Sequence, residues 1–156
     1  MEHHSPKVAI GNISMLHVSM AGMSALFGLV VSILHFSGST AGQQEGFELF
    51  LYLPAGAILI AFPVSTLLFK NQLKTSLESN VALQEKMTAF TTAHLIRMAL
   101  FEAVAVVSVV VCFVTGNLYN LIVLLAVLGV FYVRFPTAFM IENELGLTPE
   151  EKSHLH

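Results

Sequence analysis

One glutamate, Glu102, lies in the middle of a long apolar segment, where an ionisable side chain is costly. The rest of the segment 92–115 consists mostly of Ala, Val, Leu, Phe and Thr. A charged side chain at the centre of a bilayer costs at least ~2.5–3.5 kcal/mol on insertion scales, so the protonated acid is favoured there. Such a carboxyl either hydrogen-bonds to a neighbouring helix or carries a proton or an ion. Both interpretations of Glu102 stay open.

Ser24 is the predicted partner of Glu102. When the apolar segment 13–36 is aligned with 92–115 so that Ser24 stands opposite Glu102, Met20 also stands opposite Met98. The two segments run in the same direction through the membrane, so Ser24 and Glu102 lie at the same depth. This alignment predicts a polar contact between the two segments, and it suggests a duplicated helical hairpin.

Two histidines and two methionines offer a second kind of chemistry. His17 and Met20 begin one apolar segment, and His94 and Met98 begin another at a similar depth. Two histidines on facing helices are typical of haem ligation. Imidazole together with thioether sulfur suits copper. The alternative is that methionine packs and histidine bonds at the membrane boundary, as both commonly do.

Arg97 is not expected to neutralise Glu102. It lies five residues before Glu102, which is ~7.5 Å along a helix, and it points ~140° away. Its long side chain is expected to extend to the inner membrane surface. His94, one turn earlier, is expected at the same boundary.

These residues must be positioned by membrane helices, because the composition is that of a membrane protein. Of the 156 residues, 55% are hydrophobic and only 11% are charged, against ~25% charged in soluble domains. Four segments reach the ~18 residues that cross a bilayer. They are 13–36, 47–69, 92–115 and 118–135. The predicted fold is an all-α integral membrane protein with four transmembrane helices in a bundle, alternatively described as two tandem helical hairpins.

The positive charges predict the orientation. All seven Lys and Arg residues fall on the side of the two termini when the chain crosses four times, and the opposite side has none. The positive-inside rule therefore predicts that both termini are cytoplasmic, in a bacterial inner membrane.

The connections divide the chain further. Residues 1–12 form the cytoplasmic N-terminus, 13–135 the membrane domain and 136–156 a cytoplasmic tail. Segments three and four are joined by only Gly116-Asn117, which predicts an antiparallel hairpin, whereas the polar inner link 70–91 is long. The tail contains Thr148-Pro149-Glu150-Glu151, which is typical of a capped helix start.

Two resemblances accompany these patterns. Glu102 within "ALFEAVAVV" resembles the proteolipid rotor subunits of rotary ATPases, which implies a two-helix hairpin with an ion-binding glutamate. The chain departs from that family because Glu102 lies in the first helix of its hairpin, glycine repeats are missing from 92–115, and the link 70–91 is charged. These departures argue against a rotor subunit. The Arg134–Pro136 exit and the "LGLTPEE" tail look more like small, uncharacterised four-span bacterial membrane proteins, a resemblance that implies no function.

Three functions are therefore weighed. The first is a non-enzymatic membrane subunit or scaffold, surrounded by lipid and bound to other membrane subunits or to copies of itself. The second is a proton- or ion-handling module built on Glu102, and the third is a haem or copper protein built on His17 and His94. No enzyme is predicted, since the sequence contains no Asp and no glycine-rich phosphate loop. No basic run suggests nucleic acid.

Overall fold

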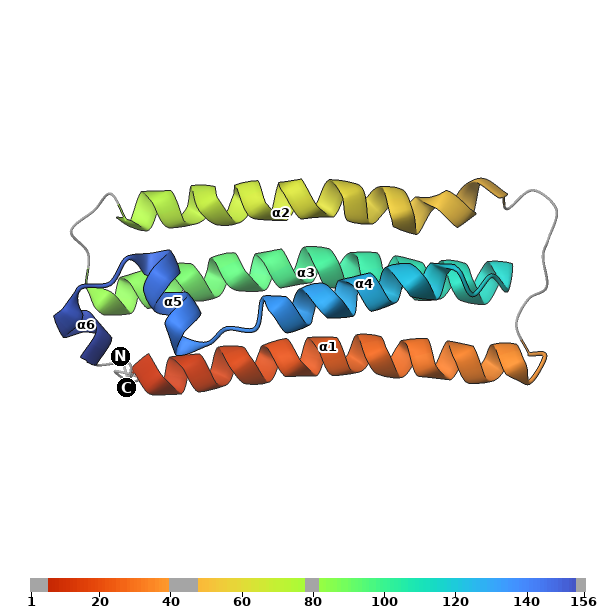
Figure 1. Cartoon of the computed structure of the whole chain (residues 1–156), viewed down its shortest axis with the longest axis horizontal. Coiled ribbons are helices and arrows are strands. Elements are labelled where there is room, and N and C mark those ends of the chain that lie inside the picture. Colours follow the sequence, from red (N-terminus) through yellow and green to blue (C-terminus); the bar gives the residue numbers. More distant parts are fainter. Residues whose placement is uncertain (1–5, 40–47, 78–81, 154–156) are drawn as a thin grey trace.

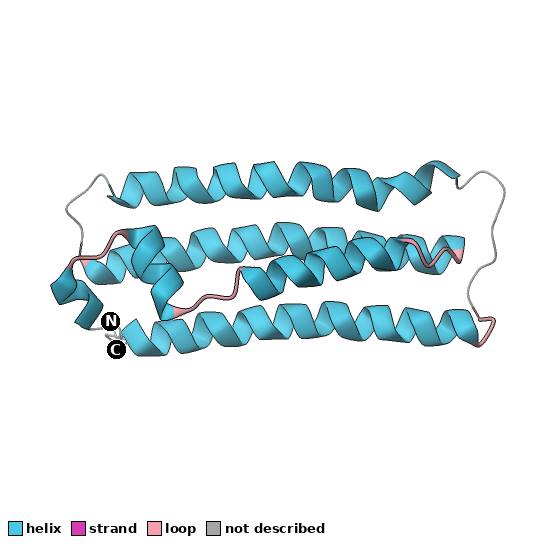
Figure 2. Cartoon of the chain, viewed as in Figure 1, coloured by secondary structure: helices cyan, strands magenta, loops and turns pink. Residues whose placement is uncertain are grey.

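The structure, a computed structural model, describes residues 6–39, 48–77 and 82–153, and this part of the chain contains helices and no strand (Figure 2). The expectation of an all-α fold is confirmed. The elements, in chain order, are α1 (Pro6–Phe36), the short 3-10 helix η1 (Glu48–Tyr52), α2 (Leu53–Leu77), α3 (Leu83–Thr115), α4 (Asn120–Val133), α5 (Ala138–Leu145) and α6 (Pro149–Ser153).

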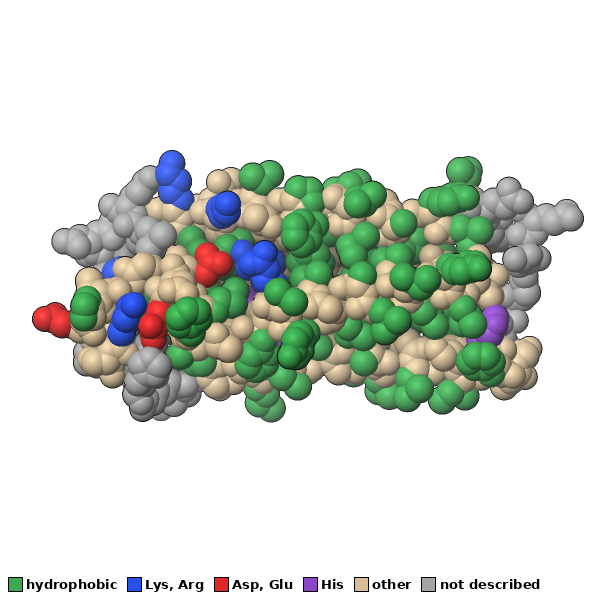
Figure 3. All heavy atoms as spheres, in the orientation of Figure 1, with side chains coloured by type: hydrophobic (Ala, Val, Ile, Leu, Met, Phe, Trp, Pro, Cys, Tyr) green, Lys and Arg blue, Asp and Glu red, His purple; other side chains and the backbone are tan. Residues whose placement is uncertain are grey.

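Three helical stretches in the described residues are long and apolar enough to cross a membrane. They are Ile10–Phe36, Leu49–Lys74 and Leu83–Thr115, with 27, 26 and 33 residues. A fourth crossing exists if α4 and α5 together make one bent span. The chain is therefore a multi-pass membrane protein, and its surface is apolar over most of its length (Figure 3).

The helix α3 lies at the centre of the molecule. It runs between α1 and α2, and α4 packs against it and contacts both of the others (Figure 1). About half of the apolar window of α3 is buried, against about a fifth for α1 and α2. Most side chains of α1 and α2 are therefore left to face lipid or another protein.

The fourth predicted span differs from the expectation. Residues 118–135 were expected to cross as one helix, but α4 has only 14 residues and ends at Val133. The chain then bends by 79° into α5. Pro136 has no N–H to continue the helix, and the residue before a proline avoids helical conformation. The turn Gly116-Asn117 is present as expected, with Gly116 in the left-handed region at φ 64° as the C-cap of α3.

The predicted inner link 70–91 is mostly helical. The helix α2 continues to Leu77, and α3 already begins at Leu83. Both extensions carry buried side chains, among them Leu73, Met87 and Phe90, which cluster with Ile141, Leu145 and Leu147 from the tail. The tail folds back over this end of the molecule, which gives the extended helices an apolar surface to pack on.

The tail ends in the predicted capped helix. The Thr148 hydroxyl accepts from the Glu151 N–H at 3.3 Å, and the Glu151 carboxylate accepts from the Thr148 N–H at 2.8 Å. The same carboxylate accepts a hydrogen bond from Lys86 Nζ on α3 at 2.8 Å. This bond and the Thr148 N–H hold the pKa of Glu151 below its ordinary value. The ion pair fastens α6 to the start of α3.

A close approach of α1 and α4 depends on Gly28. A Cβ atom at this position would collide with the Leu124 side chain, whereas a Cβ at Gly22, which lies earlier on the exposed side of α1, would meet nothing within 4 Å. Leu124 is buried in the main apolar cluster, so it has little room to move aside.

We predict that Gly28→Leu destabilises the membrane domain by about 1–3 kcal/mol, the usual cost of overpacking a well-packed core. Gly22→Leu is the matched control and should not destabilise, because Leu is the better helix former and the site is open. Unfolding of both variants in mixed micelles with increasing denaturing detergent measures the difference. Equal stability of the two variants would show that α1 and α4 do not approach closely at Gly28.

Candidate functional site

The early end of α4 creates an unpaired backbone group inside the protein. In a continuous helix the carbonyl of Phe131 would accept from the N–H of Phe135. Here the Phe135 N–H bonds instead to the Tyr132 carbonyl at 3.4 Å. The carbonyl of Phe131 is taken by the ring of His17 on α1, with Nε2 at 2.8 Å. His17 therefore caps the C-terminus of α4, a position where carbonyls lack partners within their own helix.

This hydrogen bond fixes the proton positions on two histidines. A carbonyl can only accept, so His17 Nε2 carries the hydrogen. The other nitrogen of a neutral His17, Nδ1, is then an acceptor, and it lies 3.1 Å from Nε2 of His94 on α3. His94 Nε2 must donate. The two rings and the carbonyl of Phe131 form one chain of hydrogen bonds that joins α3, α1 and α4.

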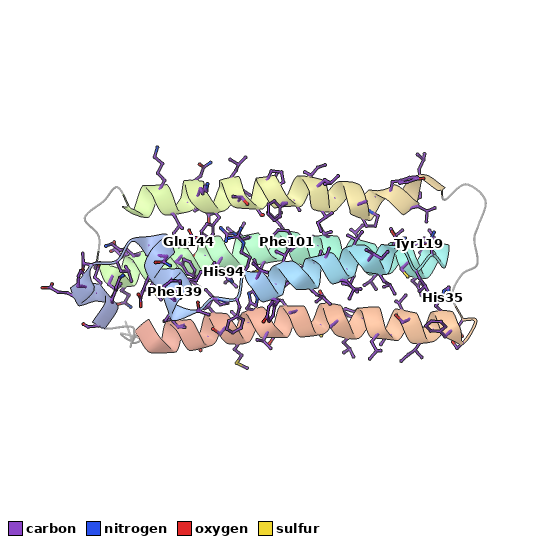
Figure 4. All side chains as sticks on the ribbon, viewed as in Figure 1. His35, His94, Phe101, Tyr119, Phe139 and Glu144 are labelled. Carbon is purple, nitrogen blue, oxygen red and sulfur yellow. The ribbon has the colours of Figure 1, made fainter. Side chains whose placement is uncertain are left out.

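His94 and Arg97 are both buried inside the protein. His94 is fully buried and lies inside the bundle (Figure 4). Its ring stacks on Phe90 at an interplanar angle of 15°, and its Nδ1 has no hydrogen-bond partner among the described residues. The expectation that Arg97 extends to the membrane surface is wrong, since only 4% of it is exposed. Its guanidinium lies 3.3 Å above the centre of the Phe69 ring of α2.

The guanidinium of Arg97 is incompletely paired. Within the described part of the chain, its Nε and Nη1 donate no hydrogen bond. The charges that act on it come from Arg134, at the end of α4, and Glu144, on α5. Arg97 therefore owes its position largely to the Phe69 ring, because a cation over an aromatic face is stabilised by the ring quadrupole.

Glu102 and Ser24 are in contact, as their alignment predicts. The Ser24 hydroxyl donates to Glu102 Oε2 at 2.7 Å. Ser24 is buried on α1, whereas Glu102 is half-buried on α3. The pair lies about 10 Å along α1 from His17, the rise of seven helical residues. The two polar contacts thus join α1 to α3 at two depths.

The residues weighed for haem or copper lie in one region. Met98 is buried in the main apolar cluster and Met20 packs against that cluster. Axial ligands on opposite faces of a haem lie ~4 Å apart with the ring between them, taking ~2 Å for a metal–imidazole bond. His17 and His94 bond directly to one another, so in this arrangement no haem fits between them. Among the described residues, no group of three or more His, Cys, Asp or Glu side chains could hold a metal ion.

Sequence reasoning did not find two members of this region. Phe131 takes part through its backbone carbonyl, and only the proline five residues later hints that this carbonyl lacks a partner. Phe69 supports Arg97 from another helix, a contact that no sequence spacing reveals.

We predict that His17→Leu destabilises the protein by about 1–3 kcal/mol, because it leaves the Phe131 carbonyl and the His94 N–H buried without partners. His35→Leu is the control at the outer end of the same helix and should change stability by less than about 0.5 kcal/mol. The double variant with His94→Leu should lose less than the sum of the two single losses, because both remove the same bond. Additive losses in detergent unfolding would contradict a direct bond between the rings.

No family model matches the chain, and neither a curated protein nor a solved structure is significantly similar to it. The two resemblances noted from the sequence therefore stay predictions. The function has to be argued from the contacts themselves.

Proposed function

We propose that the chain is a non-enzymatic integral membrane subunit or scaffold of the bacterial cytoplasmic membrane. In this proposal α1, α2, α3 and the bent pair α4–α5 make four spans of one bundle, with both termini in the cytoplasm. The observation that carries the proposal is the chain of hydrogen bonds from His94 through His17 to the carbonyl of Phe131. It uses the buried imidazoles to hold three helices together.

The same chain of hydrogen bonds is poorly suited to conduct protons. A proton passed from His94 to His17 would have to leave through Nε2, and that atom faces a peptide carbonyl. A peptide carbonyl accepts hydrogen bonds but has no proton to exchange. A structural role for the histidines therefore accounts for the geometry better than a proton path does.

The charge distribution supports the proposed orientation. Among the described residues, Lys70, Lys74, Lys86 and Lys152 lie toward the end of the molecule that carries α5 and α6. The opposite end holds Ser37–Ser39 and the turn Gly116-Asn117, which contain no basic residue. In Figure 3 the acidic and basic side chains gather at the first of these ends. The positive-inside rule would place it in the cytoplasm.

Two other functions keep a specific observation in their favour. Glu102 is half-buried near the middle of its span and has the Ser24 hydroxyl as a partner, which would suit a proton- or ion-handling module. His17 Nδ1 and His94 Nε2, 3.1 Å apart, could both reach one copper ion with help from the sulfur of Met20 or Met98. Iron and copper analysis of the protein after gentle purification tests the metal-binding function.

We predict a cytoplasmic location for both termini. A reporter that is active only in the cytoplasm should be active when it is fused after His156. A reporter that is active only on the opposite side of the membrane should be active when it is inserted at Gln43. The reason is the one-sided distribution of Lys and Arg. An external signal from the His156 fusion would overturn the orientation.

We predict that the protein purified from native membranes in mild detergent is larger than a 156-residue monomer, as native mass spectrometry would measure. Glu102→Gln should leave this assembly intact and active, since the amide keeps the size and the hydrogen bonding of the acid. An ion-handling module also predicts an intact assembly for Glu102→Gln, but one that has lost its pH-driven activity. A wild-type monomer without companions would contradict the subunit function.

A further inference from the structure

Two arginines lie toward the end of the molecule that carries α5, and neither guanidinium is paired with an anion. Only 4% of Arg97 on α3 is exposed, and its Nε and Nη1 are enclosed without a hydrogen bond. Arg134 is the C-cap of α4, and its backbone N–H bonds to the Val130 carbonyl at 2.9 Å. Among the described residues, no carboxylate makes an ion pair with either guanidinium. Two positive charges are therefore left without a counter-ion.

The fold brings these two charges to one place. His17 joins α3 to the end of α4 through its bonds to His94 and to a backbone carbonyl of α4. Arg97 follows His94 by one turn on α3, and Arg134 caps that same end of α4. The two guanidiniums act on one another, and the carboxylate that acts on Arg97 against them is that of Glu144 on α5. Figure 3 shows a basic patch next to an acidic side chain beside the end of α4. One carboxylate does not balance two guanidiniums.

Arg97 lies at the depth where lipid headgroups begin. The helix α3 ends at Thr115, beside the turn that leads to α4. From Thr115 back to Arg97 the helix rises about 27 Å, whereas the hydrocarbon core is ~30 Å thick. With Thr115 at one face of the core, Arg97 lies just inside the opposite face. Its side chain tilts toward the N-terminus of α3, which is the direction of the nearer headgroup layer.

The free donors of Arg97 suit the oxygens of a phosphate. A guanidinium presents five N–H groups in a rigid fork, and this fork binds two oxygens of one phosphate at once. In the described part of the chain, none of the three nitrogens of this guanidinium donates a hydrogen bond, and Nε and Nη1 are the two that are fully enclosed. A ligand would therefore approach at Nη2, which shares a fork with each of the other two.

Exposed aromatic side chains flank Arg134. Tyr132, Phe135 and Phe139 are 86%, 39% and 72% exposed. Tyrosine is enriched at the membrane boundary, because its ring is apolar and its hydroxyl is polar. The chain bends by 79° between α4 and α5, so these rings border the bend that Arg134 begins. A ligand that has both a phosphate and acyl chains would use the guanidiniums and the rings together, whereas a soluble anion would use only the guanidiniums.

We propose that Arg97 and Arg134 bind the phosphate of an anionic phospholipid at this end of the bundle. One phosphate oxygen accepts from the fork of Arg97, another accepts from Arg134, and the acyl chains lie along the exposed rings of Tyr132 and Phe135. The negative charge of the lipid neutralises the positive charge that Glu144 leaves over. Phosphatidylglycerol carries this charge without a cation of its own, whereas the choline of phosphatidylcholine offsets its phosphate. Anionic lipid is therefore preferred.

Native mass spectrometry of the full chain, titrated with phosphatidylglycerol, tests the site. Arg97→Gln and Arg134→Gln should each weaken phosphatidylglycerol binding at least about ten-fold, the equivalent of one charge-assisted hydrogen bond. Lys70→Gln is the matched control, because it removes one positive charge from an exposed position of α2 toward the same end of the molecule. It should leave the affinity nearly unchanged. An equal loss in Lys70→Gln would indicate a general attraction of anionic lipid to this end and would overturn the site.

Two further variants keep the test independent of folding. Arg97→Gln also removes the cation from the ring of Phe69, so helix content is measured by circular dichroism. If this variant does not fold, Arg134→Gln decides, because Arg134 is only half-buried and lies at the end of α4. Glu144→Gln should tighten phosphatidylglycerol binding, since it removes the carboxylate that competes with the phosphate. Weaker binding of phosphatidylglycerol to Glu144→Gln would contradict the proposal.

Competing ligands identify the source of the phosphate. Phosphatidylcholine should bind more weakly than phosphatidylglycerol, and millimolar inorganic phosphate should not displace the lipid. Displacement by inorganic phosphate would assign the two guanidiniums to a soluble anion and overturn the lipid. Equal binding of both phospholipids would show that the negative charge is not read. The site belongs to the single chain, so its failure would leave the membrane-subunit function standing.

Discussion

The interior of a membrane protein gives a freed backbone carbonyl no water to bond with, and this constraint governs the structure around the end of α4. Pro136 stops the helix early, and the carbonyl of Phe131 is left without its usual partner. The imidazole of His17 satisfies it at 2.8 Å, and the second nitrogen of that ring must then find a donor. His94 provides one. The Phe135 N–H bonds to Tyr132 instead of Phe131, and the carbonyl that it leaves is the end point of a chain of two buried histidines on two other helices.

The second polar contact follows from a different cause and acts at a different depth. Ser24 and Glu102 join α1 and α3 without any backbone defect. The first pair is enclosed by aromatic rings, with Phe131 and Phe90 against the two histidines. The second is only partly enclosed, because Glu102 is half-buried. The enclosed pair connects three helices through one chain of hydrogen bonds, whereas the half-buried pair connects two.

Hydropathy predicted the helical class and the apolar stretches well, because each long stretch must satisfy its own backbone in lipid. Equal depth in parallel segments was enough to predict that Ser24 meets Glu102. The same reasoning failed for Arg97, because its burial depends on Phe69 from another helix and on a tail that folds back over this end. It also missed how early α4 ends. A proline in the sequence marks a break, but it does not reveal which side chain takes over the carbonyl.

The shortness of α4 has a consequence for the surrounding lipid. Fourteen helical residues span ~21 Å, whereas the hydrocarbon core is ~30 Å thick. In the proposed four-span bundle, the helical part of α4 would therefore be shorter than the hydrocarbon core, unlike the three long helices. Thinning of the bilayer on that side would relieve the mismatch at a cost of fractions of a kcal/mol per Å. Lipids with shorter acyl chains would then be favoured along α4, which would give the molecule two unlike flanks in the membrane plane.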